Sequence, residues 1–455
     1  MSDAFDLIIV GGGSAGFAAA NRANEKGLKA ALINSGDIGG TCVNIGCVPT
    51  KFLLNVGASL HRARNPVFDG VSIGDVQMDF QRVMAEKKRI VEKLRESNYR
   101  NVLGYMPNVT LFEGRGRLLG ENRVQVGSET LEGKKTLIAI GARPVHPPFR
   151  GIDEVDFLTS DQLIEAEEVP GSLIVVGGRA VGLEFAQIFS RFGSEVTLLQ
   201  RSERILPDHE REASEALARS LRAEGIVIHT GVRVDGVYQE GDLKGVNCTI
   251  DGSKRVFEAD ELLMATGRRP DFEGFGLEEA GVETVGGFVE VDEHLRTSNP
   301  DIYAAGDCVS RFQLETLAAR MGSYAVRNAF DGAGLTVDVR EFPRAVFTDP
   351  QVALVGYTEE EYHSETGVCA CRSVSMEYVP KAQILKDTRG MVKMGINPST
   401  RQVVGVNIVA YNASELIHEG VLAYKFGLTI DDIIQTPHVF PTMMEGLKKV
   451  SHSFY

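Results

Sequence analysis

The feature that most constrains the fold is a glycine-rich turn set between an apolar run and an alanine-rich stretch. The segment FDLIIVGGGSAGFAAANRANEKGLKAALIN contains DLIIV, a continuous apolar run typical of a buried parallel strand. Gly11, Gly13 and Gly16 follow with the spacing G-x-G-x-x-G and open the alanine-rich stretch. The first glycine permits a tight turn, the second lets the backbone approach a pyrophosphate, and the third lets helix and strand pack closely. We therefore predict a strand–turn–helix–strand unit with a dinucleotide at the helix N-terminus, where Asn34 replaces the acid that usually binds a ribose hydroxyl.

A second unit of this kind begins near residue 172, in SLIVVGGRAVGLEFAQIFSRFGSEVTLLQRSER. Gly177 and Gly182 fill the first and third glycine positions, whereas Arg179 occupies the middle one. Arg201 and Arg204 stand where an acid would select NAD, and arginines there suit a 2′-phosphate. NADPH is the expected nucleotide and NADH the alternative; a solvated basic turn is the competing interpretation of the arginines.

Composition excludes several classes of function. The chain has 455 residues, 43% of them hydrophobic, and a formal net charge of −14, which argues against nucleic acid or an anionic membrane as main partner. The N-terminal MSDAFDLIIVGGG carries an acid where a signal peptide needs basic residues, and no run approaches the roughly 20 apolar residues that span a bilayer. Six cysteines are too few for a secreted disulfide scaffold. We expect a cytoplasmic protein.

The order of the segments predicts an α/β fold with two Rossmann-like dinucleotide-binding domains and a C-terminal α+β domain. Short apolar strands follow both glycine units, in LIAIGARP and LLMATGRRP, and each carries a glycine, Gly141 and Gly267. Gly306 and Asp307 end the apolar strand of DIYAAGDC, where a carboxylate can accept hydrogen bonds from a polyol chain. From about residue 338, strand patterns with turn signals indicate antiparallel pairing. The expected segments are 1–150 and 269–337 for the first nucleotide domain, 151–268 for the second, and 338–455 for the C-terminal domain.

Cysteine chemistry centres on GGTCVNIGCVPTK, where Cys42 and Cys47 stand five positions apart. In a reducing compartment such a pair is more often catalytic or metal-binding than structural. The remaining cysteines follow no zinc spacing; they are Cys248, Cys308, Cys369 and Cys371. Cys369-Ala-Cys371 would place two side chains on one face of a strand, so packing is favoured over a soft-metal site there.

Together these motifs resemble the flavin-dependent pyridine nucleotide-disulfide oxidoreductases, the family of glutathione reductase, dihydrolipoamide dehydrogenase and mercuric reductase. The resemblance covers nearly the whole chain, including the first glycine turn, GGTCVNIGCVPTK, both strands that end in Arg-Pro, AAGDC and VFTDPQVALVGYTE. It implies FAD and NAD(P)H as cofactors and a redox-active disulfide between Cys42 and Cys47, with Cys47 against the flavin and Cys42 meeting the substrate. It also implies a C-terminal dimerisation domain and a homodimer whose active sites are shared between subunits.

The same resemblance assigns further residues. Lys51 is expected near the flavin ring with Glu184 as its ion-pair partner, although a surface acid is the alternative for Glu184. The expected FAD-binding residues are Gly11, Gly13, Ser14, Ala15, Gly16, Asn34, Gly40, Thr41, Lys51, Gly141, Gly306 and Asp307. The expected NADPH-binding residues are Gly177, Gly182, Glu184, Arg201, Arg204 and Gly267.

The C-terminal element distinguishes members of the family. Thiol-handling relatives carry a His-Pro-Thr-x-x-x-Glu-like element whose histidine protonates a leaving thiolate. The corresponding segment in this chain is HVFPTMMEGLK. If its Pro-Thr and Glu445 are aligned with those of the element, Phe440 stands at the position of the catalytic base. Mercuric reductases also lack this histidine, and TMMEGLK, MEYVPKAQILKDTRG and the small residue Ala180 resemble that branch.

The leading interpretation is electron transfer from NADPH through FAD to Cys42 and Cys47, which hold and reduce a soft metal ion, Hg²⁺ to Hg⁰. The alternatives are an NAD(P)H-dependent reductase of a disulfide, quinone or other acceptor, and a flavin-binding sensor or interaction protein without turnover. Mercuric reductases usually end in a vicinal cysteine pair, whereas this chain ends in SHSFY, so either a core without its tail or another electron acceptor is expected. Phe440, Glu445 and His438 are expected to act in the partner's site; His438 is a base or ligand in one interpretation and a packing residue in the other.

Overall fold

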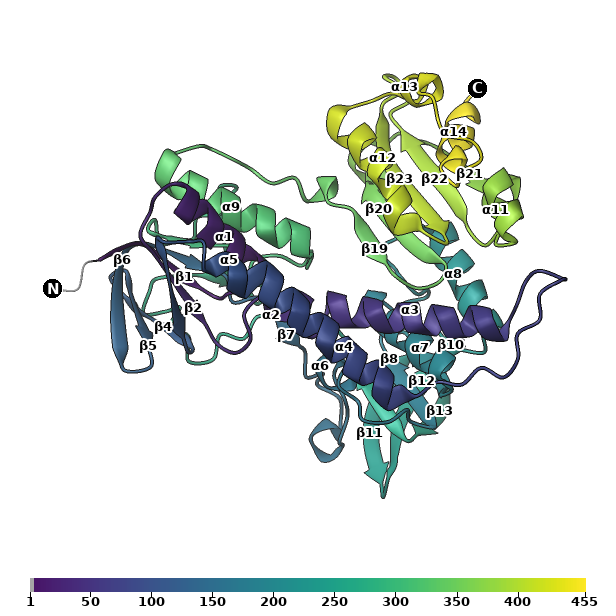
Figure 1. Ribbon diagram of the computed structural model, residues 1–455, viewed down its shortest axis with the longest axis horizontal. Helices are drawn as coiled ribbons and strands as arrows, with labels where there is room; N and C mark the ends of the chain where they lie inside the picture. The colour runs from purple at the N-terminus through teal and green to yellow at the C-terminus, as the bar shows by residue number, and fades with distance from the viewer. Residues whose placement is uncertain (1–3) are drawn as a thin grey trace. The chain divides into compact units, whose positions relative to one another are not determined.

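The computed structural model describes residues 4–455, and the chain divides into two compact units (Figure 1). The first unit consists of the described part of Met1–Pro49 with Ala85–Val145 and Gly267–Val339. The second consists of Thr50–Met84, His146–Thr266 and Arg340–Tyr455. The expected segments 151–268 and 338–455 therefore fall largely within one unit, and residues 1–3 of the expected segment 1–150 lie outside the described residues.

The first unit is built on a parallel sheet formed by the apolar runs of the sequence. DLIIV lies in β1, which pairs in parallel with β2 and β6, so that Ile8 lies opposite Ala31 and Thr136. Ile8, Ile9 and Leu32 are fully buried, as expected for strands covered on both faces. The strand order is β3-β2-β1-β6-β5-β4, and β18 pairs with β6. These strands are β1 (Phe5–Val10), β2 (Ala30–Asn34), β3 (Val109–Glu113), β4 (Gly116–Gly120), β5 (Arg123–Val126), β6 (Glu129–Ile138) and β18 (Ile302–Ala304).

Two long helices of this unit pack against each other. Gly322 of α9 approaches α1 so closely that a Cβ atom there would lie 1.9 Å from the carbonyl oxygen of Ala15, and Figure 1 shows the two helices side by side. The remaining elements of the unit are α1 (Ser14–Glu25), α2 (Gly40–Asn44), the π-helix η1 (Glu96–Arg100), α5 (Asn101–Leu103), β7 (Arg143–Pro144), β15 (Arg268–Arg269), β16 (Thr284–Val285), β17 (Phe288–Val289) and α9 (Glu315–Asp331). Three elements have residues in both units: α3 (Cys47–Arg64), α4 (Phe80–Arg95) and the short helix η3 (Val339–Glu341).

The second unit contains the second strand–helix–strand unit that the sequence predicts. SLIVV forms β8, the helix α7 follows the glycine turn, and β9 pairs with β8 in parallel in a sheet of order β10-β9-β8-β14. A separate antiparallel sheet has the order β11-β12-β13. These elements are η2 (Ile152–Glu154), α6 (Ser160–Leu163), β8 (Ser172–Val176), α7 (Ala180–Phe192), β9 (Glu195–Leu199), α8 (Arg211–Ala223), β10 (Val227–His229), β11 (Arg233–Glu240), β12 (Leu243–Ile250), β13 (Ser253–Ala259) and β14 (Glu261–Met264).

The C-terminal part of this unit is an antiparallel sheet covered by helices, as its turn signals predict. The strand order is β19-β20-β23-β22-β21, and α12 lies along β20 and β23 (Figure 1). Val355, Val406 and Ile408 are among its buried core residues. Its elements are β19 (Arg344–Val346), β20 (Gln351–Gly356), α10 (Glu359–Thr366), β21 (Ala370–Ser375), η4 (Met376–Tyr378), α11 (Pro380–Leu385), β22 (Met391–Ile396), β23 (Val403–Ala410), α12 (Ala413–Phe426), α13 (Ile430–Gln435) and α14 (Glu445–His452). Within residues 4–455, every helix is too short or too polar to cross a membrane.

Candidate active site

The first glycine turn has a shape that only glycine permits. Gly11 has φ +115°, and a Cβ atom there would lie 2.2 Å from the carbonyl oxygen of Ala139. At Gly16 a Cβ atom would lie 1.7 Å from the carbonyl oxygen of Gly11, which is why strand and helix can approach so closely. Gly13 is the N-cap of α1 and Ser14 its first residue, so the N–H groups of Ser14 and Ala15 belong to the turn of the helix that has no intrahelical acceptors. The loop can therefore receive the pyrophosphate of a dinucleotide.

Asn34 shapes this loop from the end of β2. Its side chain is 8% exposed, and its Oδ1 atom accepts a hydrogen bond from the backbone N–H of Gly12 at 3.2 Å. Its Nδ2 atom donates to the carbonyl oxygen of Gly36 at 2.7 Å. The amide oxygen has two lone pairs, so a ribose hydroxyl could still donate to the one that remains. A carboxylate side chain at this position would have no N–H group to donate to the carbonyl oxygen of Gly36.

Asp307 follows β18 and fits the role of a polyol acceptor. Burial raises the pKa of its carboxyl to about 6, and the positive charge of Arg268 only partly offsets this. Gly306, with φ +84°, brings the backbone into position just before it. A buried carboxylate is stabilised by hydrogen-bond donors, and the hydroxyl groups of a ribityl chain are such donors. The residues present therefore fit FAD at this end of the sheet.

The cysteine pair begins beside the first glycine turn. A Cβ atom on Gly40 would lie 2.7 Å from the Cα atom of Gly13, so α2 starts in direct contact with the turn. Cys42 lies half-buried in α2, and Cys47 is exposed at the first position of the 18-residue helix α3. The N-terminal end of a helix favours negative charge, which suits a thiolate at Cys47. Thr41, which directly precedes Cys42 and belongs to the expected FAD set, has its Oγ1 atom 3.5 Å from the guanidinium of Arg268.

Tyr99 is a residue of this region that the motifs did not indicate. It lies in the π-helix η1, and its ring makes an edge contact with Phe17 at a centroid distance of 4.8 Å. Burial raises the pKa of its hydroxyl to about 12, and negative charge on Cys42 and Cys47 acts in the same direction. A neutral phenol therefore stands near both sulfur atoms. The only local signal is the π-helix itself, a distortion that is frequent at functional sites and cannot be read from the sequence.

Gly141 and Gly267 meet in the first unit. Both have positive φ angles, +69° and +120°, and they lead into β7 and β15, which pair with each other. The backbone N–H of Val145 donates to the carbonyl oxygen of Gly267 at 2.9 Å. Gly267, which the sequence assigns to the nicotinamide nucleotide, is thus held beside a strand of the first nucleotide domain.

Lys51 and Glu184 form an ion pair within the second unit. The Nζ atom of Lys51 lies 2.8 Å from Oε2 of Glu184, whose side chain is almost fully buried in α7. The other carboxylate oxygen of Glu184 accepts the backbone N–H of Phe347 at 2.9 Å. Lys51 also lies over the ring of Phe347, 4.5 Å from its centroid. The ammonium group is thereby held in one position one turn after Cys47 along α3.

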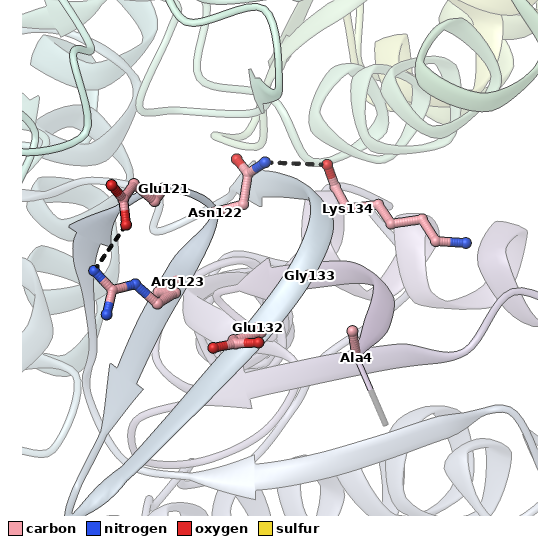
Figure 2. A pocket seen from close by; sticks show the side chains of 7 residues that line it. All are labelled: Ala4, Glu121, Asn122, Arg123, Glu132, Gly133 and Lys134. Atoms are coloured by element: carbon pink, nitrogen blue, oxygen red, sulfur yellow. Dashed lines mark hydrogen bonds and ion pairs between the residues drawn. The ribbon is translucent and has the colours of Figure 1, made fainter. Parts of the chain in front are cut away.

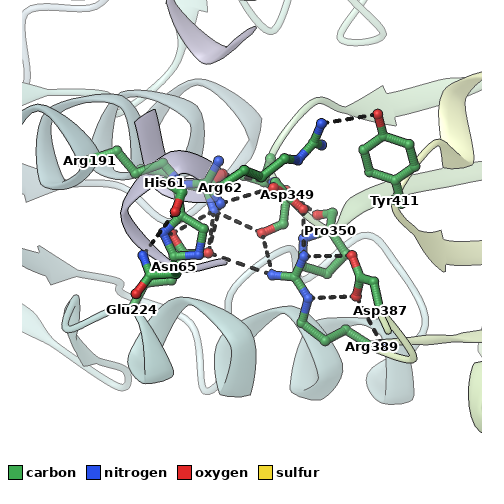
Figure 3. Close-up of polar contacts among 12 residues, drawn as sticks. His61, Arg62, Asn65, Arg191, Glu224, Asp349, Pro350, Asp387, Arg389 and Tyr411 are labelled. Atoms are coloured by element: carbon green, nitrogen blue, oxygen red, sulfur yellow. Dashed lines mark hydrogen bonds and ion pairs between the residues drawn. The ribbon is translucent and has the colours of Figure 1, made fainter. Parts of the chain in front are cut away.

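Further along α7, polar side chains tie the segment around Asp349 to the same helix (Figure 3). Gln187 exchanges two hydrogen bonds with the backbone of Asp349, at 2.7 and 2.8 Å. Arg191 makes a bidentate ion pair with Glu224, both bonds 2.8 Å, and also contacts the carboxylate of Asp349 at 3.1 Å. Arg389 reaches the other oxygen of Asp349 at 2.7 Å. Burial alone would raise the pKa of Asp349, but Arg389 and Arg191 outweigh it and hold the pKa below its ordinary value.

The second glycine turn repeats the construction of the first. A Cβ atom on Gly177 would lie 2.2 Å from the carbonyl oxygen of Ala265, and one on Gly182 would lie 1.9 Å from that of Gly177. The buried side chain of Gln200 accepts the backbone N–H of Gly178 at 2.9 Å, as Asn34 does in the first turn. The arrangement is the same, so this turn can also receive a pyrophosphate.

The arginines around this turn differ in what they contact. Arg179, the N-cap of α7, pairs with Asp208 and lies near Arg201, which is exposed. Arg204 instead donates to the carbonyl oxygens of Pro207 at 2.9 Å and His209 at 3.3 Å. Arg204 therefore stabilises its own loop, whereas Arg179 and Arg201 are both exposed to solvent.

The C-terminal candidates do not form one cluster. Phe440 is 70% exposed. Glu445 begins α14 and has its Oε2 atom buried without a hydrogen-bond partner among the described residues. His438 has both ring nitrogens engaged: Nδ1 with the carbonyl oxygen of Thr436 at 2.8 Å and Nε2 with Glu419 at 3.0 Å. Glu419, on α12, is a second residue that the sequence motifs did not indicate.

A shallow hollow in the first unit is lined by a different set of residues. It is bordered by β6 and by the β4–β5 turn, where Glu121 contacts Arg123 and the side chain of Asn122 donates to the carbonyl oxygen of Lys134 (Figure 2). Its lining is charged and open, and it contains none of the candidate catalytic or cofactor-binding residues. It carries no chemistry of the kind that the motifs imply.

Comparison with known proteins agrees with this arrangement. Residues 5–322 match the family described as pyridine nucleotide-disulphide oxidoreductase, and residues 342–451 match its dimerisation domain. The chain belongs to this family. The predicted resemblance, the α/β fold with a C-terminal dimerisation domain and the assignment as an FAD-dependent NAD(P)H oxidoreductase are thereby confirmed.

Similar proteins of the family include two curated reductases and a solved structure. The mercuric reductase of Bacillus cereus is 39% identical over 445 residues, which cover 98% of this chain and 70% of that protein. The mercuric reductase of Lysinibacillus sphaericus is 37% identical over 453 residues, covering 99% of this chain and 83% of that protein. The Cu(II) complex of the HOCl-induced flavoprotein disulfide reductase RclA from Escherichia coli matches with a TM-score of 0.87 and 27% identity, covering 100% of both chains.

Proposed function

We propose that this protein reduces Hg²⁺ to Hg⁰ with electrons from NADPH, using FAD and the Cys42–Cys47 pair. The balanced reaction is NADPH + Hg²⁺ → NADP⁺ + H⁺ + Hg⁰. FAD, when bound, would supply the two-electron chemistry that links a nicotinamide nucleotide to a dithiol/disulfide couple. The similarity to mercuric reductases over nearly the full chain supports this substrate.

Different residues would bind the cofactor and the metal ion. The turn of Gly11, Gly13 and Gly16 would hold the FAD pyrophosphate, and Asp307 would accept hydrogen bonds from the ribityl hydroxyls. Lys51, fixed by Glu184, would place a positive charge beside the flavin ring. Cys42 and Cys47, as thiolates, would bind the soft ion, because two thiolates suit Hg²⁺ better than oxygen or nitrogen ligands do.

One observation carries the choice of a metal ion over a disulfide. Reduction of a disulfide releases a thiolate that needs a proton donor, and the position expected to supply it holds Phe440. The nearby His438 cannot easily substitute, because Glu419 and the carbonyl oxygen of Thr436 already engage both of its ring nitrogens. Reduction of Hg²⁺ requires no such donor.

The proposed nucleotide is NADPH rather than NADH. The exposed Arg201, beside Arg179, is available to pair with a 2′-phosphate, whereas Arg204 is occupied by its own loop. Arginine suits phosphate because its planar guanidinium can donate two hydrogen bonds at once.

The proposed assembly is a homodimer in the cytoplasm, with active sites shared between two copies. The dimerisation domain supports the dimer, and the exposed Phe426, Val439 and Phe440 supply apolar surface for it. In this arrangement Phe440, Glu445 and His438 would lie at the site of the partner subunit, which explains why they form no cluster within one chain.

The test is an acceptor screen on the purified FAD-containing protein, following NADPH consumption with Hg²⁺, Cu²⁺, oxidised glutathione, lipoamide and a quinone in parallel. We expect Hg²⁺-dependent consumption that Cys42→Ala and Cys47→Ala abolish. Cys369→Ala, a change at a half-buried thiol outside the pair, serves as matched control and should retain activity at the Cys42–Cys47 pair. Equal or faster turnover with a disulfide or quinone would contradict the proposal.

A second candidate acceptor is Cu²⁺. The solved structure of RclA with Cu(II) supports it, because that reductase shares the fold along the whole chain. Cu²⁺ accepts one electron, so two ions would be consumed for each NADPH, and the stoichiometry of the screen distinguishes the two metals.

A further inference from the structure

Cys369 and Cys371 lie together at the edge of the C-terminal sheet. Cys371 is in β21, the edge strand of the order β19-β20-β23-β22-β21, and Cys369 immediately precedes that strand. The two thiols hydrogen-bond to each other. Both are half-buried rather than enclosed, so an ion can reach them from solvent. The alternation of a strand, which the sequence already indicated, places both sulfur atoms on one face.

Gly395 opens the space that the two sulfur atoms share. In the register of β21 and β22, Gly395 lies directly opposite Cys371. A Cβ atom on Gly395 would lie 3.4 Å from the Sγ atom of Cys371 and 4.0 Å from that of Cys369. Both sulfur atoms therefore converge over a position that has no side chain of its own.

Glu359 completes a set of three donor atoms. One carboxylate oxygen of Glu359 and the sulfur atoms of Cys369 and Cys371 all lie within 4.8 Å of one another. A metal–sulfur bond is about 2.3 Å long, so a single ion between two thiolates spans about 4.6 Å. The three donor atoms are thus close enough for one ion to bind them together.

Lys393 fixes Glu359 and leaves the surroundings negative. Its Nζ atom lies 2.7 Å from the carboxylate of Glu359 and 2.9 Å from those of Glu210 and Glu212. Three acidic groups around one ammonium group leave two formal negative charges before either thiol ionises. A divalent cation is therefore attracted to this edge of the sheet.

We propose that Cys369, Cys371 and Glu359 form a second binding site for one soft metal ion, separate from the Cys42–Cys47 pair. Binding replaces two S–H bonds by two metal–sulfur bonds: M²⁺ + 2 R–SH → M(S–R)₂ + 2 H⁺, with both protons released to solvent and no change of oxidation state. Two sulfur donors select thiophilic ions such as Hg²⁺ over Mg²⁺ or Ca²⁺, and Glu359 supplies a weaker third ligand. The site needs neither FAD nor NADPH.

The experiment measures Hg²⁺ binding to full-length, FAD-containing protein in which Cys42→Ser and Cys47→Ser remove the redox pair. The protein is reduced beforehand, and free cysteine competes for the ion. We expect one Hg²⁺ per chain, a mercury–thiolate ultraviolet band, and the loss of two titratable thiols for each ion bound. Adding Cys371→Ser should weaken Hg²⁺ binding by more than about 100-fold. Loss of a residue that only supports a metal ligand typically costs about 10- to 100-fold in affinity, so a larger loss identifies Cys371 as a ligand.

Two matched controls separate this site from general thiol binding. Cys248→Ser changes a thiol that is only 1% exposed in the core and should leave Hg²⁺ affinity and stoichiometry unchanged. Glu359→Gln should weaken binding about tenfold, whereas Glu360→Gln, the same charge change on the adjacent residue, should have no effect. Melting temperatures without the ion show that each variant is folded. Undiminished affinity in Cys371→Ser, or one ion bound per thiol, would overturn the proposal.

Discussion

Asp307 is a carboxyl group whose environment opposes its charge. Because burial raises its pKa to about 6 in the absence of a ligand, it is largely protonated below that pH. The proposed hydrogen bonds from a ribityl chain favour the ionised form and would lower the pKa in the complex. Binding of FAD should therefore be full above pH 6 and weaken by up to about tenfold per pH unit as the pH falls below 6.

Titration of apoprotein with FAD between pH 4.5 and 8, followed by flavin fluorescence, measures this dependence. Asp307→Asn should bind more weakly and lose the slope, because an amide does not titrate. A slope that persists in Asp307→Asn would assign it to another group.

His209 is a second buried titratable residue, and it affects stability rather than binding. Its imidazole is 8% exposed, and burial lowers its pKa to about 3. The unfolded chain binds a proton near pH 6.5 and the folded chain does not, so stability should fall as the pH drops from about 6.5 towards 3, by about 1.4 kcal/mol per pH unit from this group. Urea unfolding of His209→Phe should show a smaller slope over this range. The exposed His452→Phe should behave as the unmodified protein does.

At the residue scale, the sequence predicted those positions that backbone geometry requires. Gly11 and Gly16 could be identified because no other residue fits beside Ala139 or beneath the helix. Tyr99 and Glu419 could not, because their importance comes from neighbours that are brought close only by folding. The contact of Glu359 with the Cys369 region belongs to the same class.

At the scale of elements, one face of α7 organises the second unit. Glu184, Gln187 and Arg191 recur at spacings of three and four, so they lie on the same side of the helix and meet the 347–349 segment. Their partners include Phe347 and Asp349. The charged members are buried, and removing Arg191 takes the bidentate partner from Glu224 and leaves Asp349 with Arg389 alone.

Arg191→Met should therefore destabilise the protein by about 3–5 kcal/mol, because Glu224 and Asp349 would keep buried negative charges. Urea unfolding of the holoprotein measures the loss. Arg233→Met, at an exposed arginine that also pairs with an acid, is the matched control and should change stability by less than about 1 kcal/mol. A similar loss of stability in both variants would contradict the prediction, because the buried ion pairs of Arg191 would then contribute no more than an exposed pair does.

The loop after β9 allows a prediction about nucleotide choice. Arg201→Ala should raise the KM for NADPH about tenfold or more and leave the KM for NADH unchanged. The proposed partner of Arg201 is the 2′-phosphate, which NADH lacks. Arg204→Ala should instead lower the melting temperature, since Arg204 binds the carbonyl oxygens of Pro207 and His209. Steady-state kinetics with both nucleotides and thermal unfolding separate these effects. If Arg201→Ala affects both nucleotides equally, the proposed preference is wrong.

Elements were predictable where a local period or turn determines them. The two strand–turn–helix units and the antiparallel C-terminal strands follow from apolar runs and turn residues. The ion-pair network around Asp349 does not, because Arg191 and Asp349 are 158 positions apart in the chain. Sequence patterns describe neighbours along the chain, and a network of this kind is made by packing.

At the scale of the whole molecule, the proposed dimer offers a direct test of shared sites. If Cys42 of one chain works with Glu445 of the other, mixing Cys42→Ala and Glu445→Ala protomers forms hybrids with one complete site. Random reassociation should then recover about one quarter of the unmodified activity, because half of the dimers are hybrids with one of two sites intact. Sites contained within single chains would give no recovery. Reassociated single variants are the controls.

The assembly of the chain into two units is the part that the sequence reveals least. Each unit collects three separate segments, and α3 and α4 have residues in both. The glycine motifs indicate two nucleotide sites, yet they do not reveal that the second nucleotide segment and the C-terminal segment belong to one compact unit. That grouping depends on long-range contacts such as those of Gln187 and Arg191.

The bonds between α7 and the 347–349 segment have a practical consequence for protein engineering. Consider a recombinant enzyme that takes its C-terminal portion from a relative. If the crossover falls before Phe347, Glu184 and Gln187 lose their native partners, the backbone groups of Phe347 and Asp349. A junction placed after Pro350 transfers the dimer-forming portion while each of these partners stays with its native counterpart. Swapped reductases built in the second way should be the ones that retain an ordered lysine at position 51.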